Sequence, residues 1–301
     1  MAQTVLERAG VTDRDLTGST ALVTGSTSGI GRRAALALGA LGADVLVHGR
    51  DEGAGEEVVD DLTARGSDAT FVRADFASVD AVRDLAETVR ERTDALDLLV
   101  NNAGGFFRDG ATTDLGVEYT FHVNHLSPYL LTAELVDLVP DGGRIVTTAS
   151  AAHRGGSLDL GAVRSTAGYS GMSAYSRSKL ANVLFAFELD RRLDRLGRDV
   201  TANAVHPGAI PGSNFARFLP GPLPRLVGLL GGLPFVTDVD DGAAALVSLA
   251  AAERTADVSG RYFDQQTPST PSAAARDTEA QRRLWTESAD LLGIDEPLAG
   301  E

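Results

Sequence analysis

Residues 20–31 read Thr-Ala-Leu-Val-Thr-Gly-Ser-Thr-Ser-Gly-Ile-Gly, and a segment of helical pattern, 32–41, follows them. Glycines let a backbone approach a pyrophosphate closely, and the N-terminus of the next helix supplies N–H donors and a partial positive charge. The G-x-x-x-G-x-G spacing is not specific alone, but it indicates a dinucleotide site when it joins a first strand to a first helix. We therefore expect phosphate contacts from Gly25, Ser26, Thr27, Ser28, Gly29, Ile30 and Gly31.

The chain beyond this turn alternates strand-like and helix-like segments. Apolar runs predict strands at 20–24, 44–48, 69–73, 96–100, 143–148 and 200–205, with helices at 32–41, 54–64, 79–92, 115–139 and 173–196. This alternation is typical of βαβ units and of a parallel sheet that helices cover on both faces. We predict an α/β fold, a doubly wound Rossmann fold built as a single domain over residues 1–301.

Two terminal segments lie outside this alternation. Residues 1–18 are treated as an N-terminal extension, and residues 265–301 as a C-terminal tail. The tail begins with a polar stretch, 265–279, which predicts a loop. A short helix containing Leu284 and Trp285 is expected to follow it.

The composition excludes several classes of protein. With 43% hydrophobic residues the chain has enough apolar material for a full core. No apolar run reaches the roughly 18 residues of a membrane span, and residues 1–18 lack the apolar segment of a signal peptide. The absence of cysteine excludes disulfides and thiolate metal sites. From these three absences we expect a cytoplasmic protein. A formal net charge of −15 repels nucleic acid and anionic membranes, so we expect no nucleic-acid partner.

The same acidic, lysine-poor composition has two readings. It resembles that of proteins from salt-loving archaea, whose surfaces stay soluble in concentrated salt. This is the interpretation we favour; the alternative is a bacterial genome of high GC content, whose codons favour Ala, Arg, Gly and Asp.

The chain's only lysine is Lys179, four residues after Tyr175. Spacing of i, i+4 places both side chains on one face of a helix. A tyrosine has a pKa of about 10, and a nearby cation favours its phenolate, so the pair is suited to proton transfer. A surface Tyr and Lys on an amphipathic helix is the alternative when the motif is taken alone.

The end of the second predicted strand bears on the choice of nucleotide. It reads His48-Gly49-Arg50, without the Asp or Glu that usually binds the ribose 2′-hydroxyl of NAD. An arginine accommodates the 2′-phosphate of NADP, so the sequence favours NADP over NAD. Asp51 weakens the local positive field, and an ordinary exposed arginine is the alternative.

These motifs together resemble the short-chain dehydrogenase/reductase superfamily from about Thr20 to Val258. The resemblance rests on the glycine turn, on Asn101-Asn-Ala-Gly104, and on Tyr175 with Lys179. Within the superfamily the chain is most similar to the retinol dehydrogenase-like and WW-domain oxidoreductase-like group. The residues that carry this similarity are 123–132, 150–153, 175–182 and 206–208.

The resemblance implies roles for particular residues. It makes Tyr175 the general acid and base in the interconversion of an alcohol with a ketone or aldehyde, Ser150 a hydrogen-bond donor to the reacting oxygen, and Lys179 the group that lowers the tyrosine pKa and holds the nicotinamide ribose. Asn124 is expected to order a water molecule that relays protons. Tyr175 and Lys179 are also implied to contact the nucleotide. The other implied nucleotide contacts are Arg50, Asp75, Phe76, Asn102, Ala103, Gly104, Pro207 and Gly208.

The resemblance also places a helical substrate lid at residues 207–236. This stretch is rich in Pro and Gly but carries several Phe and Leu side chains, which favour a lipophilic substrate. Packing of those side chains on the protein or on a second subunit is the alternative. Phe106 and Phe107 are expected on the opposite wall. The threonine that usually follows the Pro-Gly turn is missing, and only Ser213 stands near its place.

Other functions fit the sequence less well. Four histidines lie in separate segments without metal-ligand spacing, so we read them as framework or pocket residues and expect no metal; they are His122, His125, His153 and His206. An epimerase or dehydratase is disfavoured because such relatives usually carry a larger C-terminal domain. A non-catalytic nucleotide sensor or scaffold on the same fold is the main alternative. Relatives are commonly dimers or tetramers, so a homo-oligomer is one expectation that the sequence does not decide.

Overall fold

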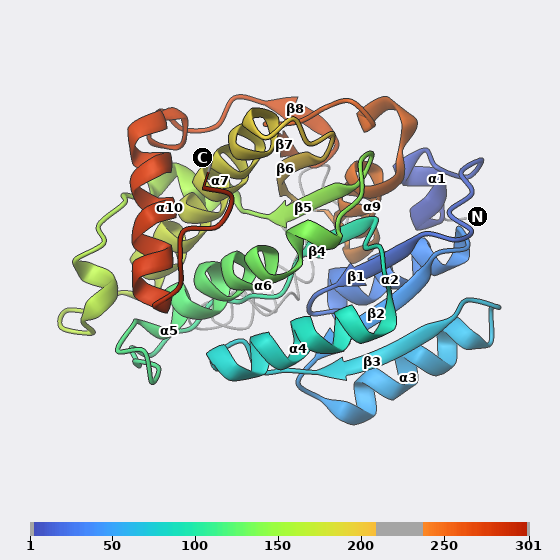
Figure 1. Ribbon diagram of the computed structural model, residues 1–301, viewed down its shortest axis with the longest axis horizontal. Helices are drawn as coiled ribbons and strands as arrows, with labels where there is room; N and C mark the ends of the chain where they lie inside the picture. The colour runs from blue at the N-terminus through green and yellow to red at the C-terminus, as the bar shows by residue number, and fades with distance from the viewer. Residues whose placement is uncertain (1–2, 209–236, 300–301) are drawn as a thin grey trace.

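One sheet forms the centre of the protein in the computed structural model, which describes residues 3–208 and 237–299 (Figure 1). Its strand order is β3-β2-β1-β4-β5-β6-β7-β8, and every neighbouring pair is parallel except β7 with β8. The strands are β1 (Thr20–Val23), β2 (Asp44–Gly49), β3 (Ala69–Arg73), β4 (Leu98–Asn101), β5 (Arg144–Thr148), β6 (Thr201–His206), β7 (Tyr262–Asp264) and β8 (Thr267–Ser269). The prediction of a doubly wound Rossmann fold is confirmed, and each predicted strand is present within two residues of its expected bounds.

Two layers of helices cover the two faces of the sheet because side chains alternate along each strand. In β1, Ala21 and Val23 face one apolar cluster while Leu22 faces the other. The first cluster lies under α1 (Val5–Ala9), α2 (Gly29–Ala40), α3 (Glu52–Thr63) and α9 (Val239–Ala251); the second lies under α4 (Val79–Arg92), α6 (Ser127–Leu135), α7 (Gly171–Arg195) and α10 (Thr278–Leu292).

The helix predicted over 115–139 is broken into pieces, which corrects the sequence prediction. It consists of α5 (Tyr119–Phe121), a π-helical segment (His122–Leu126), α6 and a 3₁₀ turn (Val136–Leu138). Pro128 near the start of α6 has no N–H to donate to the carbonyl of Asn124, so the regular hydrogen-bond ladder cannot continue there. The N–H of Ser127 instead bonds the carbonyl of His122, five residues back. Such a π-turn often marks a functional site.

The N-terminal extension is packed onto the body of the protein. Helix α1 begins at a capping box between Thr4 and Glu7, and its Ala9 is fully buried. Arg8 Nη1 lies 2.6 Å from Asp238 Oδ1 and 2.8 Å from Asp241 Oδ1, at the start of α9. These ion pairs join the N-terminus to the helix that follows the undescribed residues 209–236.

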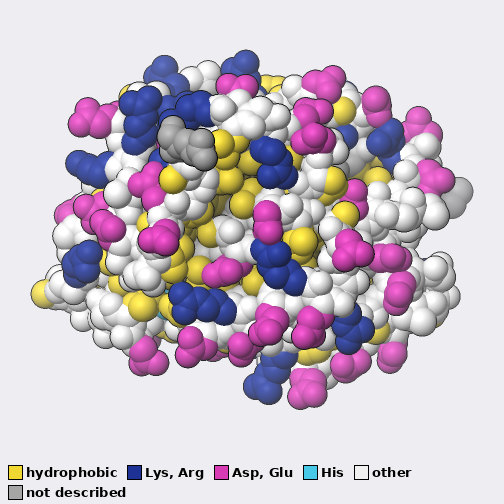
Figure 2. Space-filling model, viewed as in Figure 1, with side chains coloured by type: hydrophobic (Ala, Val, Ile, Leu, Met, Phe, Trp, Pro, Cys, Tyr) yellow, Lys and Arg dark blue, Asp and Glu magenta, His cyan; other side chains and the backbone are white. Residues whose placement is uncertain are grey.

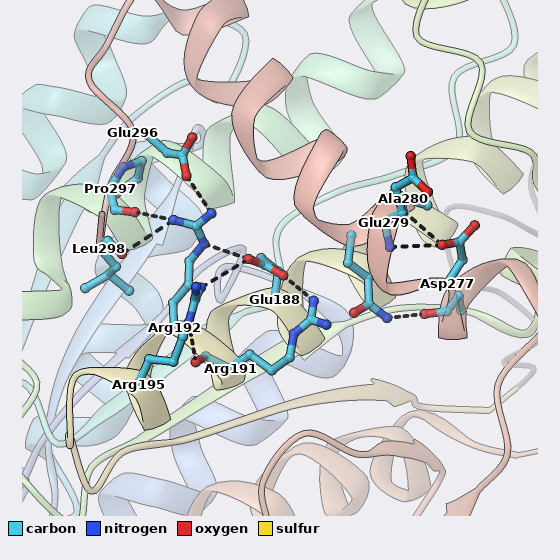
Figure 3. A network of polar contacts seen from close by, with 12 residues as sticks. Glu188, Arg191, Arg192, Arg195, Asp277, Glu279, Ala280, Glu296, Pro297 and Leu298 are labelled. Carbon is cyan, nitrogen blue, oxygen red and sulfur yellow. Dashed lines mark hydrogen bonds and ion pairs between the residues drawn. The ribbon is translucent and has the colours of Figure 1, made fainter. Parts of the chain in front are cut away.

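The C-terminal tail is fastened to α7 by charged groups (Figure 3). Buried Glu188 accepts hydrogen bonds from Arg191 and, at 2.8 Å, from Arg192 Nε. Arg192 also pairs with Glu296 at 2.5 Å, and its guanidinium lies over the ring of Trp285, 4.7 Å from the centroid. The predicted helix containing Trp285 is therefore present as α10, and Arg192 contacts both this helix and the segment that follows it.

The sequence predicted a loop over the polar stretch 265–279, but the structure shows regular elements there. This stretch contains β8 and a 3₁₀ turn, Ala274–Arg276. Strand β8 is short and lies at the edge of the sheet, where Pro268 costs no ladder hydrogen bond. A strand of three residues is too short to show the alternation of apolar and polar residues by which strands are recognised in a sequence.

The surface is mostly polar. Figure 2 shows acidic and arginine side chains interspersed over one face, with apolar side chains between them. Among the described residues, the large apolar side chains that are most exposed are Met172 and Leu196. No described helix is both long enough and apolar enough to cross a membrane.

Candidate active site

The site is positioned by the topology of the sheet. The strand order reverses between β1 and β4, and in such sheets ligands bind outside the carboxyl ends of the strands at this switch point. The ends of the two strands are tied together there: the N–H groups of Asn102 and Ala103 both donate to Thr24 Oγ1 at 2.9 Å, and Asn102 Nδ2 donates to Thr24 O at 2.9 Å. The predicted turn 25–31 and the predicted segment 102–104 therefore face each other.

The glycines of the turn are required by its geometry. Gly25 and Gly29 have φ values of 67° and 56°, in the left-handed region. A Cβ on Gly31 would collide with the carbonyl oxygen of Gly25 and lie 2.6 Å from Asn102 Nδ2. The result is a tight backbone cradle at the N-terminus of α2, which fits the pyrophosphate of a dinucleotide.

His48 holds this turn in place, a role that the sequence did not predict. Its Nδ1 accepts from the N–H of Gly25 at 3.2 Å, and its Nε2 lies 3.2 Å from the carbonyl oxygen of Ala74, to which it donates. Burial lowers the pKa of His48 to about 4, so the ring is neutral and can accept at Nδ1. The ring stacks on Phe76 with 4.6 Å between centroids. A polar residue ending an apolar strand beside the glycine turn was the only signal in the sequence.

Arg50 stands where a nucleotide's 2′-phosphate is expected, at the carboxyl end of β2. Its side chain is 64% exposed, and its Nη1 lies 4.0 Å from Asp75 Oδ1. A pair this open to solvent contributes little, so the guanidinium remains available to another anion. The side chain of Asp75 is itself half exposed and accepts from the N–H of Ala77 at 3.1 Å.

The structure brings three of the predicted catalytic side chains together. Tyr175 and Lys179 lie on α7, and Lys179 Nζ is 5.8 Å from the centroid of the tyrosine ring. Ser150 follows β5 and its side chain hydrogen-bonds that of Tyr175. Lys179 is buried, and its Nζ donates to the carbonyl oxygen of Thr148 at 3.0 Å.

Burial is the largest influence on the pKa values of Tyr175 and Lys179. It raises the pKa of the Tyr175 hydroxyl, an effect that the hydrogen bond from Ser150 opposes. The sequence predicted a Tyr175 pKa below its ordinary value, and this prediction is wrong because burial raises that pKa instead. Burial also lowers the pKa of Lys179 from 10.5 to about 8. The ammonium is therefore charged at neutral pH but loses its proton in mildly alkaline solution.

Asn124 is turned toward the same site by the π-helical segment. Its Oδ1 accepts from the N–H of Gly105 at 2.8 Å, and its Nδ2 donates to Gly105 O at 2.9 Å and to Ser178 Oγ at 3.0 Å. A Cβ on Gly104 would lie 2.8 Å from Asn124 Oδ1 and 3.8 Å from Lys179 Nζ. The backbone after β4 therefore passes directly over Asn124 and Lys179 because residue 104 is glycine.

Aromatic side chains that follow β4 lie beside the site. Phe106 meets the Tyr175 ring edge to face, with 5.8 Å between centroids, as expected of a wall residue. Phe107 packs instead on Tyr119, at 4.8 Å. Gly208 has a φ of 102°, and a Cβ there would collide with Thr237, so the two ends of the segment between them adjoin. The rest of the predicted lid, with Ser213, lies outside the described residues.

The other histidines are held by neighbours rather than grouped. His122 Nδ1 lies 2.7 Å from Thr113 Oγ1, and His125 Nε2 lies 2.9 Å from Ser288 Oγ. His153 Nδ1 donates to Ser150 O at 2.7 Å, behind the predicted catalytic serine. Within 3–208 and 237–299, no three His, Cys, Asp or Glu side chains gather as metal ligands would.

A surface hollow of about 410 Å³ lies at the β7–β8 hairpin, lined by Asp264, Gln265, Gln266, Thr267 and Ser269. None of these residues belongs to the group around Tyr175. The hollow does not mark the place where a substrate would meet that hydroxyl.

Comparison with known proteins identifies the class. Residues 19–219 match the family model of the short chain dehydrogenase. The chain is 40% identical to polyprenol dehydrogenase of Mus musculus over 92% of this chain and 84% of the relative, and 36% identical to retinol dehydrogenase 13 of Homo sapiens over 94% and 87%. A short-chain dehydrogenase from Burkholderia cenocepacia, solved in complex with NADP, superposes with a TM-score of 0.69 at 30% identity, over 84% of this chain and 99% of that one.

Fold and relatives together define an oxidoreductase of the Rossmann class. Within that class the chain belongs to the short-chain dehydrogenase/reductase family, in its retinol dehydrogenase-like group. The family resemblance drawn from the sequence motifs is confirmed.

The buried lysine makes a prediction about stability. Because its pKa is lower in the folded protein than in the unfolded chain, the folded state binds fewer protons between about pH 8 and 10.5, and stability rises with pH across that window. Lys179→Met removes a penalty of up to about 3 kcal/mol at pH 7, since one pKa unit corresponds to about 1.4 kcal/mol. Thr148 O keeps its hydrogen bond from Asn182 Nδ2.

We expect Lys179→Met to be more stable than wild type in urea unfolding at pH 7, and the difference to shrink at about pH 9.5. A variant less stable than wild type at pH 7, or a difference that does not change with pH, contradicts the buried charge.

Proposed function

We propose that the protein is an NADP(H)-dependent alcohol dehydrogenase or carbonyl reductase that uses Tyr175 as its general acid and base. The observation that carries this proposal is the group at the carboxyl edge of the sheet, where buried Lys179 lies 5.8 Å from the Tyr175 ring and Ser150 hydrogen-bonds the same tyrosine. A nucleotide sensor would not need a hydroxyl, a serine and a buried cation at one point. The family assignment supports the same reaction class.

The chemistry follows from these groups. A bound nicotinamide supplies the hydride that the carbonyl carbon gains. Tyr175 donates its proton to the carbonyl oxygen, and Ser150 steadies that oxygen by a hydrogen bond as negative charge develops. Lys179 favours the phenolate that Tyr175 becomes, because an opposite charge nearby stabilises the ionised form. Asn124, held by Gly105 and Ser178, lies beside this path and orients a water for return of the proton.

The choice of NADP rests on Arg50. It lies at the end of β2 with its guanidinium open to solvent, and no acidic side chain stands at position 49. A neighbour of similar fold was solved with NADP, which supports the same preference. Asp75, 4.0 Å away, would then orient Arg50 rather than occupy it.

A lipophilic substrate is proposed on two grounds. Phe106 presents an aromatic ring beside the Tyr175 ring, so the described wall of the site is apolar. Two relatives are named for polyprenol and retinol, which are both isoprenoid alcohols. An alcohol, ketone or aldehyde on an extended apolar body suits such a wall better than a sugar or a small acid.

Tyr175→Phe tests the mechanism. We expect reduction of a carbonyl panel to fall by about 10²–10⁴-fold, the usual contribution of general acid catalysis, while NADPH binding measured by fluorescence stays close to wild type. Tyr169→Phe is the matched control, because its hydroxyl bonds Phe107 O and Thr120 near the site without touching Ser150 or Lys179. Wild-type rates in Tyr175→Phe sink the mechanism, and tight nucleotide binding by wild type without any turnover favours the sensor.

Arg50→Ala tests the nucleotide preference. Loss of a charged hydrogen bond to phosphate costs about 1.5–3 kcal/mol, so the Kd for NADPH should rise about 10–100-fold while that for NADH changes little. Arg65→Ala, an exposed arginine just beyond α3, is the control. Equal losses for the two nucleotides refute a phosphate contact at Arg50.

A further inference from the structure

A row of buried polar side chains runs from the lysine of the site to the C-terminal helix α10. Lys179 Nζ and Asn182 Nδ2 both donate to the carbonyl oxygen of Thr148, each at 3.0 Å. His125 lies beyond Asn182, and its Nε2 is 2.9 Å from Ser288 Oγ on α10. The exposed fractions of Asn182, His125 and Ser288 are 2%, 1% and 0%.

These groups lie in apolar surroundings. The His125 ring packs against Phe121, Tyr129 and Phe185 at centroid distances of 4.9, 6.2 and 6.1 Å. A polar group in such a place is costly unless it is hydrogen-bonded. Burial holds the pKa of His125 at about 3, so the ring is neutral and has one donor and one acceptor nitrogen.

The direction of the hydrogen bonds follows from Asn182. Its Nδ2 donates to Thr148 O, which fixes the orientation of the amide and leaves Oδ1, which can only accept, for a neighbouring donor. The His125 side chain hydrogen-bonds that of Asn182, and His125 Nδ1 has no other partner among the described residues. The proton of the neutral ring then belongs on Nδ1, and Nε2 must accept from Ser288. The Ser288 hydroxyl has a second acceptor, Leu284 O at 2.7 Å, in the preceding turn of α10. Only its rotation toward His125 satisfies all three buried side chains.

We propose that α10 positions the active site through this chain, in which Ser288 donates to His125, His125 to Asn182, and Asn182 to the Thr148 carbonyl that holds Lys179. Ser288, His125 and Asn182 are positioning residues, because they act on Lys179 through the Thr148 carbonyl. His125 also belongs to the π-helical segment that carries Asn124. Helix α10 lies beyond residues 19–219, the range that the family model matches.

The test in solution has a kinetic arm, which rests on the proposed reductase function. Ser288→Ala should lower kcat for carbonyl reduction about 5–10-fold and leave the KM for NADPH within twofold. Tyr129→Phe is the matched control, because it removes another buried hydrogen bond to α10, from the Tyr129 hydroxyl to Trp285 O at 3.0 Å, without joining the chain. It should keep kcat within twofold. Equal kcat losses in the two variants, or none in Ser288→Ala, overturn the proposal.

A spectroscopic arm needs no substrate and no variant of Ser288. Long-range ¹H–¹⁵N spectra of the five histidines distinguish the two neutral tautomers, and His125→Phe assigns the His125 signals by their loss. The chain requires His125 to carry its proton on Nδ1 in wild type. The Nε2–H tautomer breaks the link to Asn182 and refutes the proposal even if turnover is normal. Lack of any turnover in wild type counts against the proposed function. In that case the His125 tautomer still tests the hydrogen-bond chain from Ser288 to Thr148.

Discussion

One buried cation constrains the whole site. Lys179 is 4% exposed, and a charge there is tolerated only where fixed acceptors meet it. The Thr148 carbonyl at the end of β5 is that acceptor, and Gly104 lets the backbone after β4 close over the same point. A compact ammonium one helical turn from Tyr175 can enter this space, whereas a planar guanidinium, which the chain uses everywhere else, is larger and keeps its charge at any pH.

The sheet brings the glycine turn and the group around Tyr175 to one edge. The glycine turn follows β1, Asn102 follows β4 and Ser150 follows β5, so parallel strands deliver all three to their shared carboxyl end. Histidines serve there as connectors and not as acids. His48 fixes the glycine turn and His153 the backbone of Ser150, and burial lowers the pKa of both rings, so that each remains a neutral donor and acceptor.

Most of this arrangement can be predicted from the sequence wherever the residues that determine a feature are neighbours in one segment. The strands are apolar runs, the turn is spelled by its glycines, and Tyr175 with Lys179 is a single helical repeat. Prediction fails where the cause is tertiary. The raised pKa of Tyr175 depends on burial, and the roles of His48 and Asn182 depend on partners 23 and 34 residues away. Strand β8 carries no local apolar pattern.

The pKa of Lys179 is the most direct measure of this account. Because the chain has one lysine, protein labelled with ¹³Cε-lysine gives one side-chain NMR resonance, which can be followed through a pH titration without mutation. A midpoint at about pH 8 is the predicted result and places the buried ammonium beside Tyr175 as described. A midpoint near 10.5, the value of a solvated lysine, would mean that the charge is not buried and that the site is not built around it.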